Sequence, residues 1–239
     1  MIGKNNMIKN KNLISGISQR LDGNMKFHED ENDEKVFENR KKFLESNGIS
    51  VENLVSCKLV HGKKIAIVGR GDCGSIIADT DGLITSEKDV CISVTVADFL
   101  PIYFFDKEKE IIGILHAGYK GVVDRAVVDM VNKMKEEFNS LPSDILVYIG
   151  PHIKDCHFCI GDDQKYLYSD FKDFVTSREN GTFVDLCGIV EKDLLELEIP
   201  KNNIEISSKC TYCDEELFSY RRDRPEKVNA QIAFICMKK

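Results

Sequence analysis

The order of hydrophobic and polar positions predicts strands along much of the chain. Runs rich in β-branched and aromatic residues are bounded by polar or glycine-containing turns. They span residues 54–60, 64–68, 90–96, 100–105, 110–115, 144–149, 203–207 and 229–236. We expect the first two runs to pair around the His61-Gly62 turn. Residues 13–31 contain the turn-forming sequence Asp22-Gly23-Asn24 and are expected to be irregular, with one short strand.

Apolar residues with helical spacing predict four helices. The clearest covers residues 122–138, where Val123, Val127 and Met130 belong to one apolar stripe. Another covers residues 33–46 and ends at Asn47-Gly48. Two more are expected near residues 162–175 and 190–197. Because strands and helices follow one another without a linker or an internal repeat, we interpret the chain as an α/β domain with mixed sheets and flanking helices.

Length and composition agree with one domain of this kind. The chain has 239 residues, of which 42% are hydrophobic, so a sizeable core can form. Residues 1–12 are polar and rich in lysine and asparagine. We therefore expect a disordered N-terminal segment over residues 1–12, followed by a single domain over residues 13–239.

The charge of the chain limits the class of partner. A formal net charge of −7 argues against a broad electrostatic surface for nucleic acid or an anionic membrane. The N-terminal segment does not resemble a signal peptide, and the sequence lacks an apolar run of the ~20 residues that a membrane helix needs. These features predict a cytoplasmic, soluble protein, and they leave its oligomeric state open.

Nine cysteines are unusual in a chain of this kind. Their odd number and the lack of an export signal favour reduced thiols over disulfides. Cys156 and Cys159 form one closely spaced pair, and Cys210 and Cys213 form another. The pairs are further apart in sequence than those of an ordinary zinc ribbon, so two interpretations stay open: a structural metal or redox pair, and buried thiols that pack as small hydrophobic groups.

His116 is the strongest single candidate for chemistry. It closes an apolar strand and precedes a turn that contains Gly118 and Gly121. The first amides of the following helix carry partial positive charge, and Lys120 adds a full charge, so this turn is a candidate seat for an anion. An ordinary turn with an exposed histidine is the alternative. His61 also lies at a strand end, and the two histidines matter together only if the fold brings them close.

Three motifs carry a resemblance to a known family. They are Leu59-Val60-His61-Gly62, Val96-Ala97-Asp98-Phe99 and His116-Ala117-Gly118-Tyr119-Lys120-Gly121. They resemble the Gln-Val-His-Gly, Thr-Ala-Asp-Cys and His-Ala-Gly-Trp-Arg-Gly motifs of the laccase-domain (YfiH-like) family. Further similar segments follow in family order from about residue 14 to the C-terminus: Asn39-Arg40, Asp81-Gly82-Leu83-Ile84-Thr85, Ile149-Gly150-Pro151, Asp185-Leu186, Cys210-Thr211 and Phe218-Ser219-Tyr220-Arg221-Arg222.

The resemblance implies a fold and an activity. The family has a layered α/β/β/α domain with mixed sheets, and its members are described as polyphenol oxidases and as purine nucleoside phosphorylases. Phosphorolysis of adenosine or inosine would use phosphate as co-substrate, and deamination of adenosine is also attributed to the family. The family's zinc ligands fall on His61, Phe99 and His116, so His61 and His116 are the candidate metal ligands here.

Roles for the other site residues follow from the same resemblance. His61, His116 and Asp98 are the catalytic candidates, with Asp98 as a polar contact. Gly118, Lys120 and Gly121 would form the phosphate seat, with Phe99 against the substrate. Arg221 and Arg222 would be forked phosphate partners, because a guanidinium binds phosphate through two parallel donors.

Phe99 is the main departure from the family pattern. Phenylalanine has no lone pair for a metal, so the two histidines would form a weaker and more exchangeable zinc site. Tyr119 and Lys120 also replace the family's Trp-Arg. Two alternatives to the altered phosphorylase therefore stay open. One is a non-catalytic ligand-binding or interaction relative, in which Phe99 fills the cavity or stacks on a bound base. The other is a cell-wall precursor hydrolase that would need a different thiol. Five histidines are too few for the several copper centres of a phenol oxidase.

Overall fold

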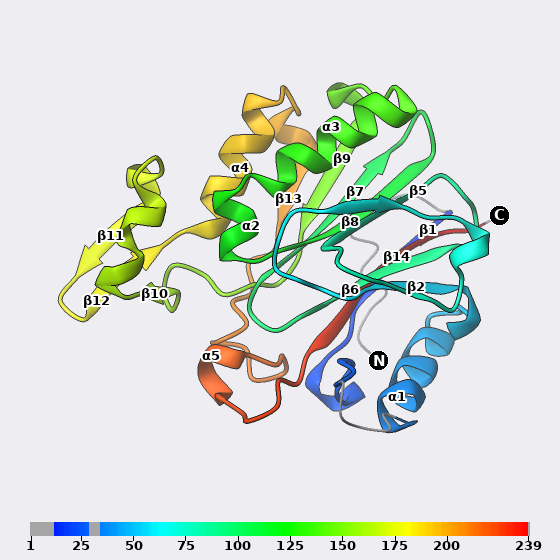
Figure 1. Ribbon diagram of the computed structural model, residues 1–239, viewed down its shortest axis with the longest axis horizontal. Coiled ribbons are helices and arrows are strands. Elements are labelled where there is room, and N and C mark those ends of the chain that lie inside the picture. Colours follow the sequence, from blue (N-terminus) through cyan, green and yellow to red (C-terminus); the bar gives the residue numbers. More distant parts are fainter. Residues whose placement is uncertain (1–11, 29–33, 239) are drawn as a thin grey trace.

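The computed structural model describes residues 12–28 and 34–238, and it has four layers (Figure 1). Two sheets pack face to face in the middle of the molecule. Helix α1 (Glu34–Ser46) covers the outer face of one sheet. Helices α2 (Tyr119–Val123), α3 (Ala126–Phe138) and α4 (Leu186–Glu196) cover the outer face of the other. This is the α/β/β/α arrangement of mixed sheets that the sequence led us to expect.

The sheet under α1 has five strands in the order β1-β14-β6-β2-β4. Their bounds are β1 Leu13–Ile17, β14 Gln231–Met237, β6 Cys91–Val96, β2 Leu54–Cys57 and β4 Ile76–Ile77. Strand β2 runs parallel to both of its neighbours, whereas β14 runs antiparallel to β1 and β6. The first and last strands of the domain therefore lie side by side.

The second large sheet has six strands in the order β13-β9-β7-β8-β5-β3. Their bounds are β13 Ile204–Ile206, β9 Ile145–Ile149, β7 Leu100–Asp106, β8 Ile111–Ala117, β5 Gly82–Thr85 and β3 Ile65–Ile67. The two outermost pairs are parallel and the inner pairs are antiparallel. The structure thus has two mixed sheets.

A small third sheet lies to one side of these layers (Figure 1). It contains β10 (Cys159–Ile160), β12 (Gly181–Val184) and β11 (Val175–Arg178). A one-turn helix, α5, spans Tyr220–Asp223. Short 3-10 turns lie at Arg20–Asp22, Val51–Asn53, Arg70–Asp72, Pro142–Asp144, Asp162–Tyr168, Lys172–Phe174 and Lys201–Asn203.

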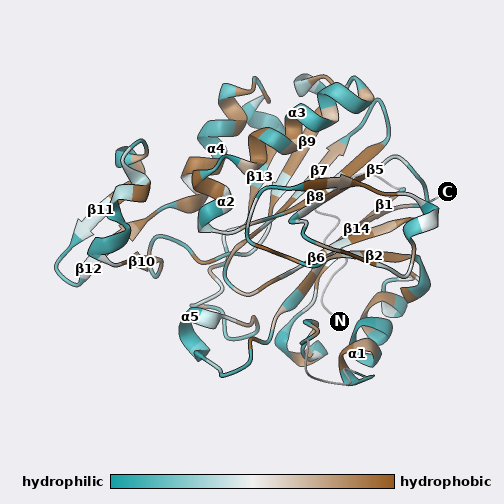
Figure 2. Cartoon of the chain, in the orientation of Figure 1, coloured by the Kyte–Doolittle hydropathy of each residue, from teal (hydrophilic) through white to brown (hydrophobic). Residues whose placement is uncertain are grey.

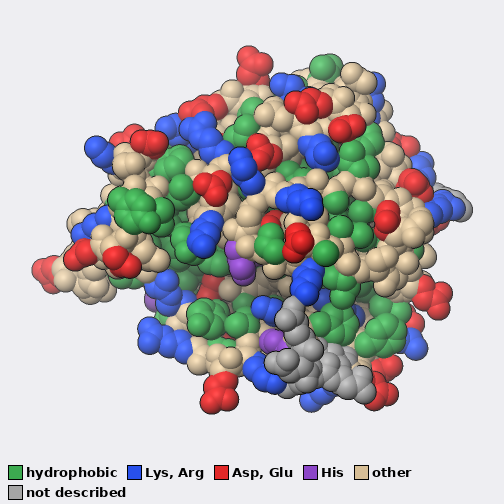
Figure 3. Space-filling model, in the orientation of Figure 1, with side chains coloured by type: hydrophobic (Ala, Val, Ile, Leu, Met, Phe, Trp, Pro, Cys, Tyr) green, Lys and Arg blue, Asp and Glu red, His purple; other side chains and the backbone are tan. Residues whose placement is uncertain are grey.

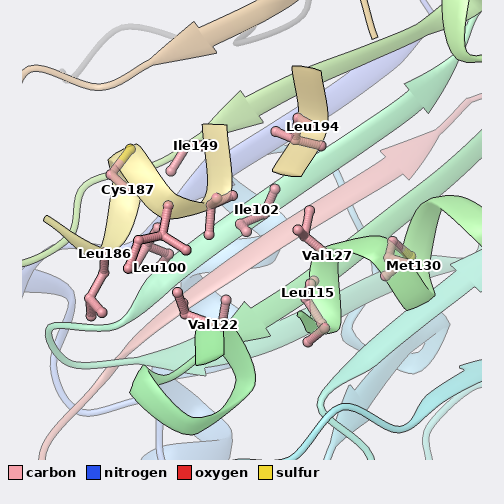
Figure 4. Packing of buried hydrophobic residues seen from close by; sticks show 14 of the residues in the cluster. Leu100, Ile102, Leu115, Val122, Val127, Met130, Ile149, Leu186, Cys187 and Leu194 are labelled. Atoms are coloured by element: carbon pink, nitrogen blue, oxygen red, sulfur yellow. The ribbon is translucent and has the colours of Figure 1, made fainter. Parts of the chain in front are cut away.

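Alternation along the central strands explains why both faces of each large sheet are buried. In β7, Tyr103 and Phe105 enter the core between the sheets, whereas Leu100, Ile102 and Phe104 face α3 and α4. Strands β8 and β14 divide their residues in the same way. Figure 2 shows hydrophobic residues along these inner strands, and Figure 4 shows the packing of the helix-side core. A strand buried on both faces reads as a continuous apolar run.

The pairing expected around the His61-Gly62 turn is wrong. Strand β2 pairs with β6 and β4 in the five-stranded sheet, whereas β3 pairs with β5 in the six-stranded sheet. The turn therefore crosses from one sheet to the other. The physical reason is that the amides of Val60, His61 and Gly62 donate to the Asp81 carboxylate, so they are not available for a hairpin ladder.

Two helical predictions also need correction. The helix expected over residues 122–138 is two helices, α2 and α3, because Arg125 between them adopts a left-handed backbone with φ 57°. Its guanidinium lies beside Asp193 and Glu196 of α4. The helix expected near residues 162–175 is replaced by two 3-10 turns that lead into β11. The sequence pattern also did not predict the third sheet.

The remaining predicted elements agree with the structure within a few residues, whereas strands β4 and β5 and helix α5 were not predicted. Helix α1 corresponds to the predicted helix over residues 33–46, of which residue 33 lies outside the described range, as do residues 1–11 of the expected disordered segment. Helix α4 begins earlier than predicted, because Asp185 accepts a hydrogen bond from the amide of Gly188 and caps it. Among the described residues, every helix is too short or too polar to cross a bilayer.

Candidate functional site

A cavity of about 600 Å³ opens where β2, β6 and β8 end. Its wall combines the carboxyl ends of these strands with the 26–28 segment, the 57–61 loop and the 220–221 turn. Figure 3 shows a hollow on this face with histidine and Lys/Arg side chains beside it. The position of the cavity agrees with the sheet topology. Strands β2 and β6 run parallel, so their carboxyl ends lie at the same edge of the five-stranded sheet.

Two histidines and a phenylalanine meet in the wall of this cavity. The ring centroids of His61 and His116 are 5.0 Å apart, and the Phe99 ring lies 5.9 Å from His61 and 5.8 Å from His116. His116 lies near the end of β8, Phe99 lies just before β7, and His61 lies in the turn between the two sheets. The fold therefore brings together the two histidines whose proximity the sequence left open.

Asp81 connects the two histidines. Its carboxylate accepts hydrogen bonds from the amides of Val60, His61 and Gly62 at 3.2, 2.8 and 2.8 Å. Its backbone carbonyl accepts the His116 amide at 2.7 Å. His61 has a left-handed backbone with φ 58°, and the carboxylate holds the turn in this conformation. Asp81 therefore positions both imidazoles, although the sequence analysis gave it no role of its own.

The environment lowers the pKa of His61. Partial burial at the cavity mouth is the main cause and the nearby His116 the second, so the pKa falls to about 4, although Asp81 acts in the opposite direction. At neutral pH His61 is therefore an uncharged imidazole with one N–H donor and one acceptor nitrogen. The His116 ring is buried, and its Nδ1 lies 3.7 Å from Asp81 Oδ1 without a hydrogen-bond partner among the described residues.

Gly118 and Gly121 bring the α2 turn close to these rings. A Cβ atom on Gly118 would lie 3.3 Å from Phe99 and 3.4 Å from both His61 and His116. A Cβ atom on Gly121 would lie 2.9 Å from the carbonyl oxygen of Gly62. Gly121 therefore provides space for the His61 turn, which is a packing role different from the phosphate seat expected from sequence.

Replacing Gly121 with alanine is expected to lower the free energy of unfolding by about 1–3 kcal/mol, because the new methyl group would overlap a backbone oxygen that has little freedom to move. Urea unfolding followed by circular dichroism measures this change. The matched control is Gly71→Ala, since a Cβ atom on Gly71 would meet nothing within 4 Å. Equal stability of the two variants would contradict the packing role.

Asp98 lies in the wall of the cavity, and its carboxylate accepts two hydrogen bonds. One carboxylate oxygen accepts from the Thr211 hydroxyl and the other from the Arg221 amide, both at 2.7 Å. Its carbonyl accepts the Ile153 amide, and its backbone φ is 94°. Asp98 thus ties together three segments around the cavity. Asp98 therefore has a positioning role, in addition to the catalytic role that the sequence led us to expect.

The two candidate arginines differ in position. Arg221 lines the cavity, lies over the Phe158 ring, and donates to the carbonyl of Cys159 at 2.8 Å. The Arg222 guanidinium instead donates to the carbonyls of four residues in the preceding loop, Thr211, Tyr212, Asp214 and Leu217. Among the described residues, the cavity wall includes Arg221 but excludes Arg222, Gly118, Lys120 and Gly121.

Comparison with known proteins identifies the family. A model of the family described as multi-copper polyphenol oxidoreductase laccase matches residues 14–238. The chain belongs to this laccase-domain family. The chain is 33% identical to purine nucleoside phosphorylase YlmD of Geobacillus stearothermophilus, over 84% of this chain and 78% of that protein. It is 36% identical to a purine nucleoside phosphorylase of Clostridium acetobutylicum, over 64% of this chain and 65% of that relative, slightly less than two thirds of its length.

Solved structures of laccase-domain proteins have the same fold. YfiH of Bacillus licheniformis superimposes with a TM-score of 0.88 at 26% identity, covering 95% of this chain and 93% of that chain. YlmD of Geobacillus stearothermophilus superimposes with a TM-score of 0.88 at 27% identity, covering 96% and 93%. The expected family and fold are therefore confirmed.

The three-residue zinc site implied by the laccase-domain family does not fit the residues of this chain. His61 and His116 can each supply a ring nitrogen, but the third position holds a Phe99 ring that contacts both imidazoles edge-on. A hydrocarbon ring has no lone pair for a metal, so only two of the three family ligands are present.

Most of the positive charge in the cavity wall was not predicted from the sequence. Lys26, Arg40 and Lys58 line it together with Arg221, and Asp98 is the acidic residue among the wall residues of the described chain. The buried Arg40 donates to the carbonyl of Met25 and the hydroxyl of Ser56. Of these residues, Arg40 belongs to the Asn39-Arg40 motif, which could have identified it from the sequence. Lys26 and Lys58 belong to no motif.

A second cluster of metal-ligating side chains lies beside the cavity. Cys156, His157, Cys210 and Cys213 bring their ligand atoms within 4.8 Å of one another. The sequence analysis paired Cys156 with Cys159, but the Cys159 thiol instead contacts the carbonyl of Ile160. His157 therefore takes the place of Cys159 as the fourth member of the cluster. All nine cysteines are free thiols, as expected.

Proposed function

We propose that this protein is a purine nucleoside phosphorylase that works in the His61–Phe99–His116 cavity without the family's three-ligand zinc site. The observation that carries the proposal is the meeting of two imidazoles and an aromatic ring in a cavity whose charged wall is mostly cationic. Relatives with the same fold are named purine nucleoside phosphorylases. Small molecules, a purine nucleoside and phosphate, are accordingly the expected partners.

The cationic wall suits phosphate, the co-substrate of the reaction. Phosphorolysis forms a bond between a phosphate oxygen and C1′ of the ribose while the bond from C1′ to the purine nitrogen breaks. Arg221, Lys26 and Lys58 bring positive charge to the cavity. Such charges attract the phosphate and hold it near C1′, and a preorganised site makes this interaction stronger than it is in water. Because Arg222 and Lys120 lie outside the wall, we assign them no direct contact with the phosphate.

The aromatic and imidazole groups suit the purine and the ribose. Phe99 and Phe158 offer ring surfaces on which a base can stack. The leaving purine carries the electron pair of the broken bond, so it needs a hydrogen-bond donor or a proton. The neutral His61 ring presents an N–H group for this purpose, and His116 lies beside it. Asp81 and Asp98 hold the loops that carry these groups.

The assay incubates the protein with adenosine or inosine, with and without phosphate, and measures adenine or hypoxanthine by chromatography. We expect base release only with phosphate, and a loss of about 10²–10⁴-fold in kcat/KM in His116→Ala, because a positioned proton donor or acceptor contributes about that much. Lys135→Ala, a change at an exposed position of α3, is the control and should retain activity. Absence of base release from the wild-type protein at any phosphate concentration would reject the proposal.

Deamination is expected to be the weaker activity. It needs an activated water molecule at the purine ring, and Phe99 removes one of the ligands through which the family would hold a metal for that purpose. The same incubation measures it, because inosine formed from adenosine is resolved from adenine. A deamination rate that exceeds the rate of phosphorolysis would contradict the assignment of phosphate chemistry to this cavity.

Phe99 also favours a second candidate function, a ligand-binding relative without catalysis. The ring lies beside both histidines and offers a surface on which a bound base can stack. This function predicts nucleoside binding by calorimetry together with no base release. A hydrolase with a cysteine nucleophile has less support. Cys57 is a thiol in the cavity wall, and burial raises its pKa to about 12, so it stays protonated at neutral pH.

A further inference from the structure

The cluster of Cys156, His157, Cys210 and Cys213 joins two loops that are far apart in the sequence. Cys156 and His157 precede β10, whereas Cys210 and Cys213 lie between β13 and α5. An isolated parallel bridge between His152 and Cys210 brings the two loops together. The cluster is separate from His61, Phe99 and His116, because none of its four residues is in the described wall of the cavity.

Distances within the cluster match the edges of a tetrahedral metal site. Zinc bonds of about 2.3 Å to sulfur and about 2.05 Å to nitrogen place two sulfurs about 3.8 Å apart, and a sulfur and a nitrogen about 3.5 Å apart. The sulfurs of Cys156 and Cys210 are 3.7 Å apart. His157 Nδ1 lies 3.2 Å from the Cys156 sulfur and 3.4 Å from the Cys213 sulfur. All remaining pairs are within 4.8 Å.

We propose that Cys156, His157, Cys210 and Cys213 bind one structural Zn²⁺ ion. Three thiolates and one imidazole are a soft ligand set of the kind that selects zinc and closes its coordination sphere. Binding of Zn²⁺ displaces the three thiol protons to solvent and leaves one lone pair from each ligand on the metal. Oxidation state does not change, so the step needs no other reactant.

Neighbouring groups hold the ligands in place. The backbone amides of Lys154, Tyr212 and Cys213 lie near the Cys210 sulfur, where they favour a thiolate. The His157 ring stacks on Tyr212, with centroids 3.9 Å apart and an angle of 13° between the planes. Neighbours of this kind orient metal ligands and support their negative charge.

Packing as inert hydrophobic groups explains this cluster less well. Cys156 and Cys213 are exposed and His157 is half-buried, so water is not excluded from three of the four side chains. A disulfide would need sulfurs about 2.05 Å apart, far less than the 3.7 Å between Cys156 and Cys210. Four ligand atoms at tetrahedral spacing therefore call for a cation.

The ion would stabilise one side of the cavity. Arg221 donates to the carbonyl of Cys159 and lines the cavity, and Arg222 donates to the carbonyls of Thr211 and Tyr212. Thr211 also donates its hydroxyl to Asp98. A metal that fixes both loops thus fixes the backbone to which these side chains bind, so its role is structural.

Metal content of the full-length protein tests the proposal. Purification and gel filtration under reducing conditions, followed by elemental mass spectrometry, should give about one zinc per chain in the wild type. In the double variant Cys156→Ser/Cys213→Ser, the zinc content per chain should fall at least about tenfold. Cys159→Ser is the matched control and should retain its zinc, because this thiol lies beside the cluster but outside it. His61→Ala/His116→Ala should also retain it.

A second measurement does not depend on the folding of any variant. Wild-type protein reconstituted anaerobically with Co²⁺ should show the d–d bands of a tetrahedral site together with sulfur-to-cobalt charge transfer. Either of two results would overturn the proposal: no stoichiometric metal after reconstitution, or loss of metal in the His61/His116 variant with retention in the cysteine variant. Both readouts are independent of phosphorolysis, so failure of the proposed activity leaves them unchanged.

Discussion

Phe99→Cys is expected to raise the zinc affinity of the His61–His116 pair by more than about a hundredfold. The loss of even an outer hydrogen-bond partner costs a zinc site about 10–100-fold in affinity, and this substitution adds a direct thiolate ligand. The Phe99 ring now lies 5.9 Å from His61 and 5.8 Å from His116, so this position can present a thiolate to both imidazoles.

The measurement needs a background in which the second cluster cannot bind. We would place Phe99→Cys in Cys156→Ser/Cys213→Ser protein and determine the zinc affinity by competition with a chromophoric chelator. Phe99→Ser in the same background is the matched control, because it opens the same space without a thiolate. If the protein that retains Phe99 binds zinc as tightly as the cysteine variant, the aromatic ring does not block metal binding and our interpretation of this site is wrong.

Asp81→Ala is expected to lower the free energy of unfolding by about 3 kcal/mol or more, because three backbone amides lose a buried acceptor at once. The left-handed His61 turn should relax as well, so activity in the cavity should fall together with stability. Chemical denaturation measures the first effect. Asp170→Ala, an exposed carboxylate, is the control and should change stability little.

The same carboxylate gives a pH dependence of stability with a defined sign. Burial raises the pKa of Asp81, but the neighbouring His116 and the hydrogen bonds donated by the amides of Gly62 and His61 outweigh it, so the folded-state pKa is lowered. The ionised form therefore stabilises the fold above the ordinary pKa of about 3.9, and this contribution is lost as the pH falls through the folded-state pKa. In Asp81→Asn, the free energy of unfolding should fall less steeply as the pH is lowered. A fall as steep as that of the wild type would show that Asp81 does not cause this pH dependence.

Local patterns in the sequence predicted most of the central elements. Continuous apolar runs such as residues 100–105 indicated strands buried on both faces, and helical spacing located α1 and the main part of α3. The motifs around His61 and His116 led to the family, which the family model confirms. These successes have a common cause, because each rests on residues close together in the chain.

The predictions that failed depended on partners distant in the sequence. Residues 54–60 and 64–68 looked like a hairpin, yet the carboxylate of Asp81 holds the intervening turn and sends the two strands into different sheets. The helix over residues 122–138 divides at Arg125, whose guanidinium lies beside α4. Neither partner can be identified by periodicity, which describes a segment and the face it buries but not the segment that covers it.

The sequence by itself determined the α/β class, the family and the phenylalanine at position 99, because periodicity and motifs are properties of short segments. Only the tertiary structure decided that His61 and His116 meet, that Arg221 but not Arg222 lines the cavity, and that His157 joins Cys156, Cys210 and Cys213. The physical reason is that a site needs atoms within a few ångströms of one another. In this chain those atoms come from loops whose relative positions depend on sheet pairing and on buried hydrogen bonds between distant residues.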